Sequence, residues 1–282
     1  MTRMLVPLFG KEEIDSVVLG AASKLAKSGG ALIDARLFCR DLAAVVPFAG
    51  EGLTPEVMEQ LRQSAKAEHD LQEKNARSSF NVWCVHDEVP LGDVAAQGSL
   101  AANFAVCQGH LPSIIVKPAR VSDMALFVCA TNNEDDERQA LAEAVLVDAL
   151  RPLLLLPAKP VSTIARNIVI AWNGSAEAAR AVSMSQALLK AADKVTIVTV
   201  GDETDPRTLA VTLQSNGIVA VPHVVTAGKT DISQALLIQA EKFDADLMII
   251  GAYSHSRMRE VIFGGVTREL FENTSIPTLM IH

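Results

Sequence analysis

The chain has 282 residues, a formal net charge of −8 and an apolar fraction of 49%, with only 4% aromatic residues. This hydrophobicity excludes a disordered chain, and the length predicts two domains of roughly 100–150 residues each. The negative charge excludes the broad basic surface that nucleic-acid binding requires, so no nucleic-acid partner is expected. A core rich in small and branched aliphatic side chains suits a parallel sheet that is covered by helices on both faces.

The expected location is the cytoplasm. No stretch approaches the roughly 20 apolar residues of a transmembrane helix, so no membrane partner is expected. The apolar run at the N-terminus is too short for a signal peptide. All four cysteines, Cys39, Cys84, Cys107 and Cys129, lie in the first half. A long chain with few cysteines and no export signal is typical of a reducing compartment.

The first half alternates predicted strands and helices. A strand over 3–10 precedes a helix whose apolar stripe begins at Ile14 and ends at Leu25. The segment 89–114 has no evident counterpart in the second half, so we treat it as an extra segment whose place is left open. The remaining strands of this half are predicted over 31–38, 123–128 and 151–156.

The second half repeats the same order. Ser175 is the predicted N-cap of a helix that ends at about Ala191. Strands are predicted over 167–172, 194–200, 218–225, 246–250 and 277–281, and further helices over 206–215, over 231–243 and up to 273.

The repeated pattern predicts two tandem domains, residues 1–158 and 159–282, joined near 158–165. Strands that alternate with helices imply right-handed crossovers and a parallel sheet. We therefore expect an α/β protein of two doubly wound domains, Rossmann-like or flavodoxin-like, each with a five-stranded parallel sheet and helices on both faces.

A glycine-bearing loop follows the fourth strand of the second half. In a doubly wound sheet, ligands bind beyond the carboxyl ends of the strands, where the strand order reverses. Gly251, Gly264 and Gly265 allow the backbone to pass close to a ligand. The last helix begins beside the latter two, so its free N–H groups favour a phosphate. Positive charge in this stretch comes from Arg257, Arg259 and Arg268.

In this loop the chain resembles the universal stress protein family. ATP-binding members carry a loop of the form G-x2-G-x9-G-[ST], which is followed by an apolar residue and often by Thr. The positions that match this pattern are Gly251, Gly264, Val266 and Thr267. The resemblance extends to the adenine side, where Ala171, Asn173 and Val200 correspond to the first-strand turn and to the end of the second strand.

Three positions depart from the family pattern. Ser254 replaces the second motif glycine, and Gly265 replaces the motif Ser or Thr. Asn173 stands where the family usually has Asp. If residue 254 needs a left-handed backbone, Ser costs on the order of 1 kcal/mol there. These departures weaken the expectation of ATP binding more than the expectation of fold.

The resemblance implies a non-catalytic binding module of the bacterial stress response that responds to an adenine nucleotide. ATP or a related adenine nucleotide, with Mg²⁺ as its companion ion, would bind in the second domain. The implied cofactor-binding residues are Ala171, Asn173, Val200, Gly251, Ser254, Gly264, Gly265, Val266 and Thr267. Two alternatives stay open: a tandem module that has lost nucleotide binding and acts through protein contacts, or a slow ATP hydrolase.

The same resemblance implies how the two copies associate. Family members commonly dimerise through the last strand of each domain. The two copies would then form an intramolecular pseudo-dimer, with residues 151–156 beside 277–281. Whether whole chains also form a homodimer is left open.

The first copy is not expected to bind a nucleotide. No glycine occurs between Gly109 and Gly174, so its equivalent loop lacks a glycine-lined phosphate cradle. The corresponding stretch, 132–137, instead carries four carboxylates that would repel a triphosphate.

Other constellations give weaker hypotheses. Cys84 and His86 would share a face of a strand, and Cys107 and His110 would lie one helical turn apart, so four ligands could hold Zn²⁺. Core cysteines with exposed histidines are the favoured interpretation, so no metal site is expected. The chain has no G-x-S-x-G, H-E-x-x-H or P-loop motif, so no catalytic residue is expected.

Overall fold

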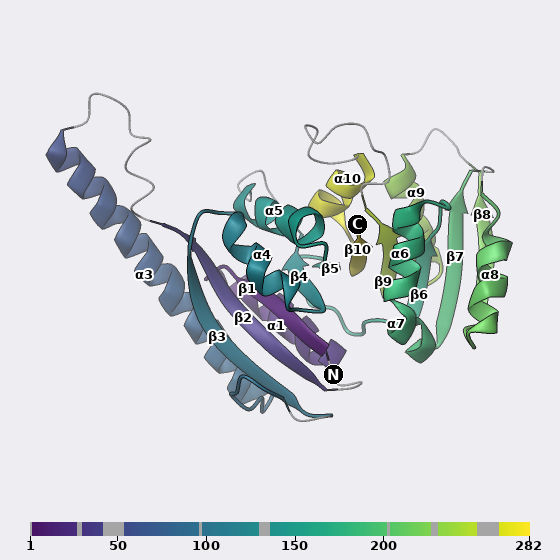
Figure 1. Cartoon of the computed structure of the whole chain (residues 1–282), viewed down its shortest axis with the longest axis horizontal. Coiled ribbons are helices and arrows are strands. Elements are labelled where there is room, and N and C mark those ends of the chain that lie inside the picture. The colour runs from purple at the N-terminus through teal and green to yellow at the C-terminus, as the bar shows by residue number, and fades with distance from the viewer. Residues whose placement is uncertain are drawn as a thin grey trace. The chain divides into compact units, whose positions relative to one another are not determined.

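The structure is a computed structural model. Contacts divide the chain into two units, residues 1–127 with 136–149, and residues 128–135 with 150–282. Each unit contains a sheet flanked by helices (Figure 1). The residues that the structure describes are 2–26, 30–41, 54–95, 98–129, 136–201, 204–226, 231–252 and 265–282.

The first unit has the strand order β3-β2-β1-β4, and each neighbouring pair in this order is parallel. Helices α1 and α3 pack on one another over one face of this sheet, and α4, α5 and a π-helical turn, η1, lie over the other (Figure 1). The elements are β1 (Thr2–Leu8), α1 (Glu12–Ala26), β2 (Ala31–Arg40), α3 (Pro55–His86), β3 (Leu100–Gly109), α4 (Ser113–Arg120), β4 (Met124–Val128), α5 (Asp136–Glu143) and η1 (Ala144–Asp148).

The second unit has the strand order β5-β10-β9-β6-β7-β8. All neighbours from β10 to β8 are parallel, whereas β5 is antiparallel to β10, with Leu154 opposite Leu279. The elements are β5 (Leu153–Leu156), β6 (Asn167–Ala171), α6 (Ala176–Met184), α7 (Gln186–Ala191), β7 (Lys194–Val200), α8 (Pro206–Ser215), β8 (Ala220–Val225), α9 (Ile232–Lys242), β9 (Leu247–Gly251), α10 (Gly265–Asn273) and β10 (Thr278–Ile281).

The predicted α/β class and the internal repeat are confirmed. The order β3-β2-β1-β4 in the first unit corresponds to β8-β7-β6-β9 in the second. Ser175 caps α6 as expected, because its side chain accepts a hydrogen bond from Ala178 N. The single helix expected over 176–191 is divided at Ser185 into α6 and α7.

The predicted pairing of residues 151–156 with 277–281 is observed as β5 beside β10. This pairing explains why contacts group β5 with the second unit. The domain boundary at residue 158 and the pseudo-dimer remain predictions.

The extra material of the first unit is not the segment 89–114. That segment contains β3, which occupies the same place in the strand order as β8 of the second unit. The addition is α3, which has 32 residues where α8 has 10. Local sequence supports its start, because Thr54 accepts a hydrogen bond from Val57 N and Pro55 stands in the first turn.

Candidate functional site

The carboxyl ends of β6, β7 and β9 form one rim of the second sheet. Ala171, the last residue of β6, lies between Val198 of β7 and Ile250 of β9. Val200 and Gly251 end those two neighbouring strands. The register therefore brings together three of the residues that the family resemblance assigns to a nucleotide site.

Asn173 shapes the turn that leaves β6. Its side-chain Oδ1 accepts a hydrogen bond from Ser175 N at 3.1 Å, and its carbonyl accepts one from Thr204 Oγ1 at 3.2 Å. Gly174 follows with a φ of +74°, which favours glycine. Asn173 is exposed, and with Oδ1 engaged its Nδ2 is the side-chain group that can serve a ligand.

Gly251 has a packing role. A Cβ at this position would lie 2.6 Å from the backbone carbon of Glu177 and would also meet Ala178 N. The start of α6 therefore passes directly over the end of β9, and only glycine leaves room for it. This close approach is sufficient to explain why glycine stands at position 251 of the family pattern, and no bound ligand is needed for that explanation.

Helix α10 begins at Gly265, so Val266 and Thr267 lie in its first turn. Because α10 connects the parallel strands β9 and β10, its N-terminus is at the carboxyl rim, where its first N–H groups have no intrahelical acceptor. Ser254 and Gly264, like Arg257 and Arg259, lie outside the described residues.

A buried serine ties α10 to α9. The Ser233 hydroxyl contacts both Asp231 Oδ1, at 2.6 Å, and Glu269 Oε2. The hydrogen bond from the Ser233 hydroxyl lowers the pKa of Asp231, which caps α9. Beyond this tie, Arg268 Nε is paired with Glu272 Oε1 at 3.0 Å. The second turn of α10 is thus tied to the start of α9.

A hollow of about 610 Å³ lies between α6–α7 and α8 in the second unit. Trp172 marks its end at the rim, because this residue follows β6 directly. Its walls are half apolar and half hydroxyl or amide, and include Val182, Leu209, Leu213 and Thr208, with Lys190 at the far end. No sequence pattern signals this hollow, because its walls come from α6 and α7 and from a third helix, α8, that lies apart from them along the chain.

The matching turn of the first unit is covered by α3. Gln72 Nε2 donates to the Phe9 carbonyl at 3.2 Å, and Asn75 Nδ2 lies 3.4 Å from the Gly10 carbonyl. The buried carboxylate of Asp15 accepts hydrogen bonds from Phe9 N and Gly10 N, at 2.8 and 3.0 Å. Burial raises the pKa of Asp15 to about 6, although both backbone donors and the charge of Arg138 oppose the rise. The turn is closed by the protein itself.

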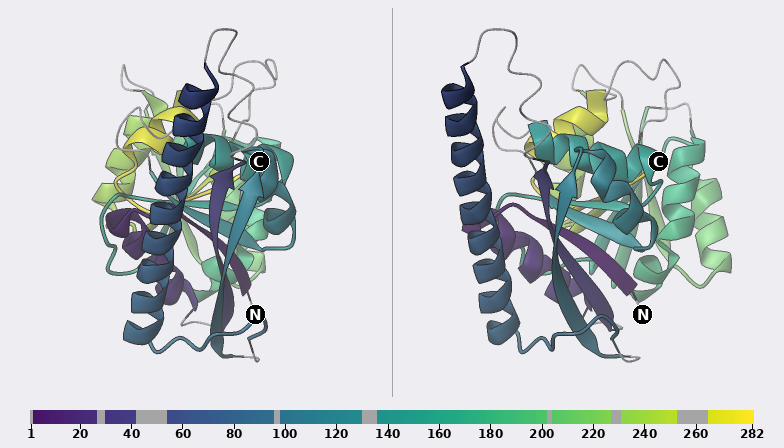
Figure 2. Two further views of the ribbon diagram at one scale, coloured as in Figure 1. Left: turned by 90° about the vertical axis from the view of Figure 1, so that its left-hand side faces the viewer. Right: turned by 60° about the vertical axis from the view of Figure 1, so that its left-hand side comes forward.

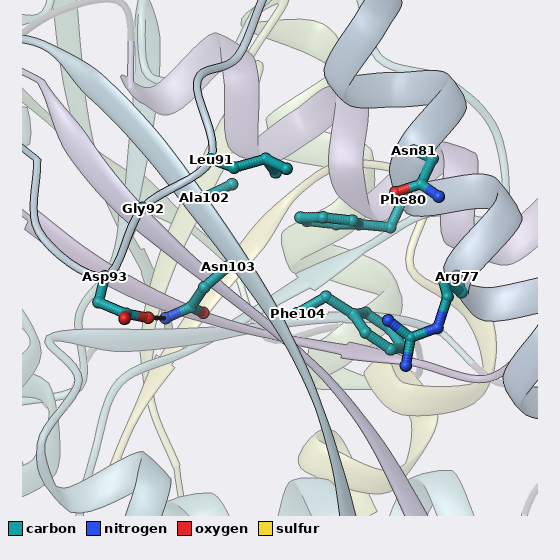
Figure 3. Close-up of a pocket in the computed structure, with 9 residues that line it drawn as sticks. All are labelled: Arg77, Phe80, Asn81, Leu91, Gly92, Asp93, Ala102, Asn103 and Phe104. Carbon is teal, nitrogen blue, oxygen red and sulfur yellow. Dashed lines mark hydrogen bonds between the residues drawn. The ribbon is translucent and has the colours of Figure 1, made fainter.

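The first unit has a separate hollow of about 380 Å³ between α3, the segment 91–93 and β3 (Figure 3). The Arg77 guanidinium lies 4.6 Å from the centroid of the Phe104 ring, and the Phe80 ring lies 5.6 Å from it. Asn103 Nδ2 donates to Asp93 Oδ1 at 3.0 Å. The charged side chains of this hollow, Arg77 and Asp93, thus already have protein partners, since Arg77 also pairs with Glu73 at 2.7 Å.

The alternative of a zinc site is wrong in its geometry. Cys84 and His86 lie near the end of helix α3 rather than on a strand, and Cys107 lies in β3 rather than in a helix. In the part of the chain that the structure describes, no group of three or more His, Cys, Asp or Glu residues could hold a metal ion. Nor does any helix there have the length and apolar character to cross a bilayer.

Comparison with known proteins agrees with this geometry. The model of the universal stress protein family matches residues 203–282. Universal stress protein Slr1230 of Synechocystis sp. is 28% identical over 145 residues, which cover 49% of each chain. The match thus spans about half the length of that relative.

Solved structures show the same fold over the whole chain. A universal stress protein from Archaeoglobus fulgidus superposes with a TM-score of 0.63 at 15% identity, covering 99% of this chain and 96% of that one. A putative universal stress protein from Pseudomonas aeruginosa gives 0.56 at 11% identity, covering 100% and 93%. Residues 203–282 match the universal stress protein domain, and the fold of the whole chain is that of these solved structures. Sequence similarity to the family model is concentrated in the second unit, whereas the fold covers both units.

Proposed function

We propose that the second unit binds an adenine nucleotide at its carboxyl rim, and that this universal stress protein acts as a non-catalytic, nucleotide-responsive module. The observation that carries the proposal is the register, which brings Ala171, Val200 and Gly251 to the same sheet end as the N-terminus of α10. A strand rim beside a helix N-terminus is where doubly wound sheets hold nucleotides.

The chemistry divides along the rim. The backbone at Val200 and the Nδ2 group of Asn173 would recognise the base and ribose. The first N–H groups of α10, at Gly265 and Val266, would hold phosphate oxygens, with the Thr267 hydroxyl as a further donor. Ser254 and Gly264 belong to the proposed set by the family spacing. Mg²⁺ would accompany a triphosphate and reduce its charge.

The proposal includes no hydrolysis. Glu269, in the second turn of α10, accepts a hydrogen bond from the Ser233 hydroxyl. This carboxylate is therefore not proposed as the base that would activate water for hydrolysis. Cytoplasmic action in the bacterial stress response is proposed from the resemblance to the family alone.

A second candidate is a module that has lost nucleotide binding and acts through protein contacts. The packing of α6 over Gly251 favours it, because a motif glycine that the fold itself requires would persist without a ligand. The internal use of Asn173 Oδ1 in the turn points the same way.

Calorimetric titration of the whole chain with ATP, ADP and AMP, each with and without MgCl₂, separates the two candidates. We expect saturable binding that Gly265→Asp weakens at least tenfold, because a carboxylate at the start of α10 opposes phosphate. The helix itself tolerates this change, since a carboxylate in a first turn favours the dipole. No heat at millimolar nucleotide, or equal affinity in the variant, would reject the proposal.

The matched control is Gly20→Asp, also a glycine-to-aspartate change in a helix. A Cβ at Gly20 meets no heavy atom within 4 Å, and this residue belongs to the first unit. We expect its affinity to equal that of the parent chain. A phosphate-release assay on the same samples tests the non-catalytic part, which turnover above the buffer rate would contradict.

A further inference from the structure

An exposed stripe of side chains follows the whole length of α3. Its positions are separated alternately by four and three residues, the spacing with which one helix meets a second helix. All nine side chains are exposed, and exposure reaches 57% at Leu71, 66% at Val82 and 81% at Val85. The stripe consists of Val57, Leu61, Ser64, Glu68, Leu71, Asn75, Ser78, Val82 and Val85.

In the second half of α3, the side opposite the stripe faces its own unit, whereas residues 56–71 include no buried side chain. Ala76, Phe80 and Trp83 are buried there against the first sheet and α1. In the left panel of Figure 2, the lower part of α3 crosses in front of the sheet of the first unit. The stripe is therefore a long exposed surface of apolar and polar side chains, of which Asn75 also contacts its own unit at the Gly10 carbonyl.

The order of side chains along the stripe is a palindrome of polarity centred on Leu71. Counting outward from Leu71, Glu68 corresponds to Asn75 and Ser64 to Ser78, so polar residues match polar ones. At the ends, apolar residues match apolar ones, since Leu61 corresponds to Val82 and Val57 to Val85. A surface that matches itself after reversal is self-complementary across a two-fold axis.

Charge selects the antiparallel arrangement. A parallel pair in register would place Glu68 against Glu68 of the second copy, and like charges at core positions disfavour such a pair. An antiparallel pair places Glu68 opposite Asn75 and beside Lys74 of the second copy, which supplies the opposite charge. Asn75 donates to the Gly10 carbonyl through Nδ2 at 3.4 Å, so its Oδ1 is the group left for the partner.

The helix is formed before any partner binds. Thr54 caps it, Gln63 Nε2 donates to Glu59 Oε1 at 3.0 Å, and Arg77 pairs with Glu73 at 2.7 Å. A helix that is already ordered loses little conformational entropy on association. From Val57 to Val85 the stripe extends about 42 Å at 1.5 Å per residue.

We infer that α3 is a dimerisation surface, which pairs antiparallel with α3 of a second copy of this chain around a two-fold axis at Leu71. Leu71 of each copy then packs against its symmetry mate at the centre. Val57 and Leu61 at one end of each helix then pack on the two valines, Val82 and Val85, at the other end of the second copy's helix. This surface is separate from β5 and β10 and from the proposed nucleotide rim.

Sedimentation equilibrium tests the pairing with charge reversal at the axis. We expect the parent chain to be a dimer and Leu71→Asp and Leu71→Lys each to be monomers, because each variant brings two like charges together. An equimolar mixture of the two variants should dimerise again. Three results would each overturn the inference: a parent chain that is monomeric at roughly 100 μM, where even a weak dimer forms, a dimeric Leu71→Asp, or a mixture that stays monomeric.

Two controls accompany this test. Val211→Asp makes the same kind of change at a valine on α8 that is 64% exposed, and it should leave the dimer intact. Circular dichroism should show an unchanged thermal transition for Leu71→Asp, since Leu71 is 57% exposed and contributes little to the fold. If that variant loses helix, the cross-linking of the cysteine variants decides the question, because those substitutions alter no charge.

Cross-linking with a short bismaleimide decides the orientation. In a background without the four native cysteines, Leu71→Cys should cross-link to itself. Val57→Cys alone should not, because its two copies stand near opposite ends of the pair. A mixture of Val57→Cys with Val85→Cys should cross-link. Self-linking of Val57→Cys, or no product from the mixture, would reject the antiparallel pair.

Discussion

The carbonyl oxygen of Gln72 lies 2.5 Å from the point that a Cβ of Gly10 would occupy. Helix α3 therefore rests directly on the turn after β1, and the side chain of Gln72 holds the Phe9 carbonyl as well. The corresponding turn of the second unit, at Asn173, is exposed. Two copies of one strand order thus differ in whether the turn after the first strand is covered by protein.

Gly10→Ala should destabilise the chain by about 3 kcal/mol, since it combines a left-handed backbone with a clash against the main chain of α3. The φ of Gly10 is +66°. Urea denaturation followed by circular dichroism measures the change. Gly20→Ala is the control, and it should stabilise by about 0.5–1 kcal/mol because alanine suits a helix interior. Equal effects of the two substitutions would contradict the contact with Gln72.

Asp15→Asn should flatten the pH dependence of stability between about pH 4 and 6. Burial raises the pKa of Asp15 from 3.8 to about 6, so in this range the native carboxyl retains a proton that the unfolded chain has lost. The free energy of unfolding therefore falls as pH rises through this window, by roughly 3 kcal/mol at most, and asparagine does not titrate.

The measurement is urea denaturation of both chains at pH 4, 5, 6 and 7. The difference between the chains isolates Asp15, because Glu143, whose pKa burial raises to about 7, titrates in both. Parallel stability curves over this range would show that Asp15 does not titrate there.

Gly251→Ala should weaken the fold of the second unit as well as any nucleotide binding. The added methyl group meets the backbone of Glu177 and Ala178, which should cost about 1–3 kcal/mol. Hydrogen exchange should increase in β9 and α6. Gly265→Asp should instead keep this protection and lose binding alone. Unchanged exchange in Gly251→Ala would mean that the packing of α6 on β9 does not require glycine at this position.

Cys107 should react with iodoacetamide before the other cysteines at pH 8. Burial raises the pKa of Cys39 to about 12 and that of Cys84 to about 11, so few of their thiols are ionised. Cys129 is buried, whereas Cys107 is half-buried, with Arg36 Nη1 at 3.5 Å from its sulfur. Peptide mass spectrometry over time measures the order. Labelling of Cys39 or Cys84 at the rate of Cys107 would contradict it, and urea should equalise all four.

Sequence patterns were sufficient wherever the signal is local. The run of apolar residues from Asn167 to Trp172, the capping Ser175 and the glycine spacing from Gly251 each depend on neighbours along the chain. The α/β class, the repeat and the succession of strands and helices along the second half followed from them. Family spacing also named the rim residues that the register brings together, namely Ala171, Val200 and Gly251.

The tertiary structure alone decided the features that depend on contacts between distant residues. Residues 84 and 86 are compatible with a strand or a helix locally, and they are helical because Ala76, Phe80 and Trp83 bury one side of α3. The residues of β3 are mostly half-buried, so they lack the apolar alternation that predicts a strand. Their extended conformation is fixed by pairing with β2. Sequence spacing marks Gly251 and Gly10 as turn residues. It cannot show which backbone passes within van der Waals reach of them, because chain packing sets that distance.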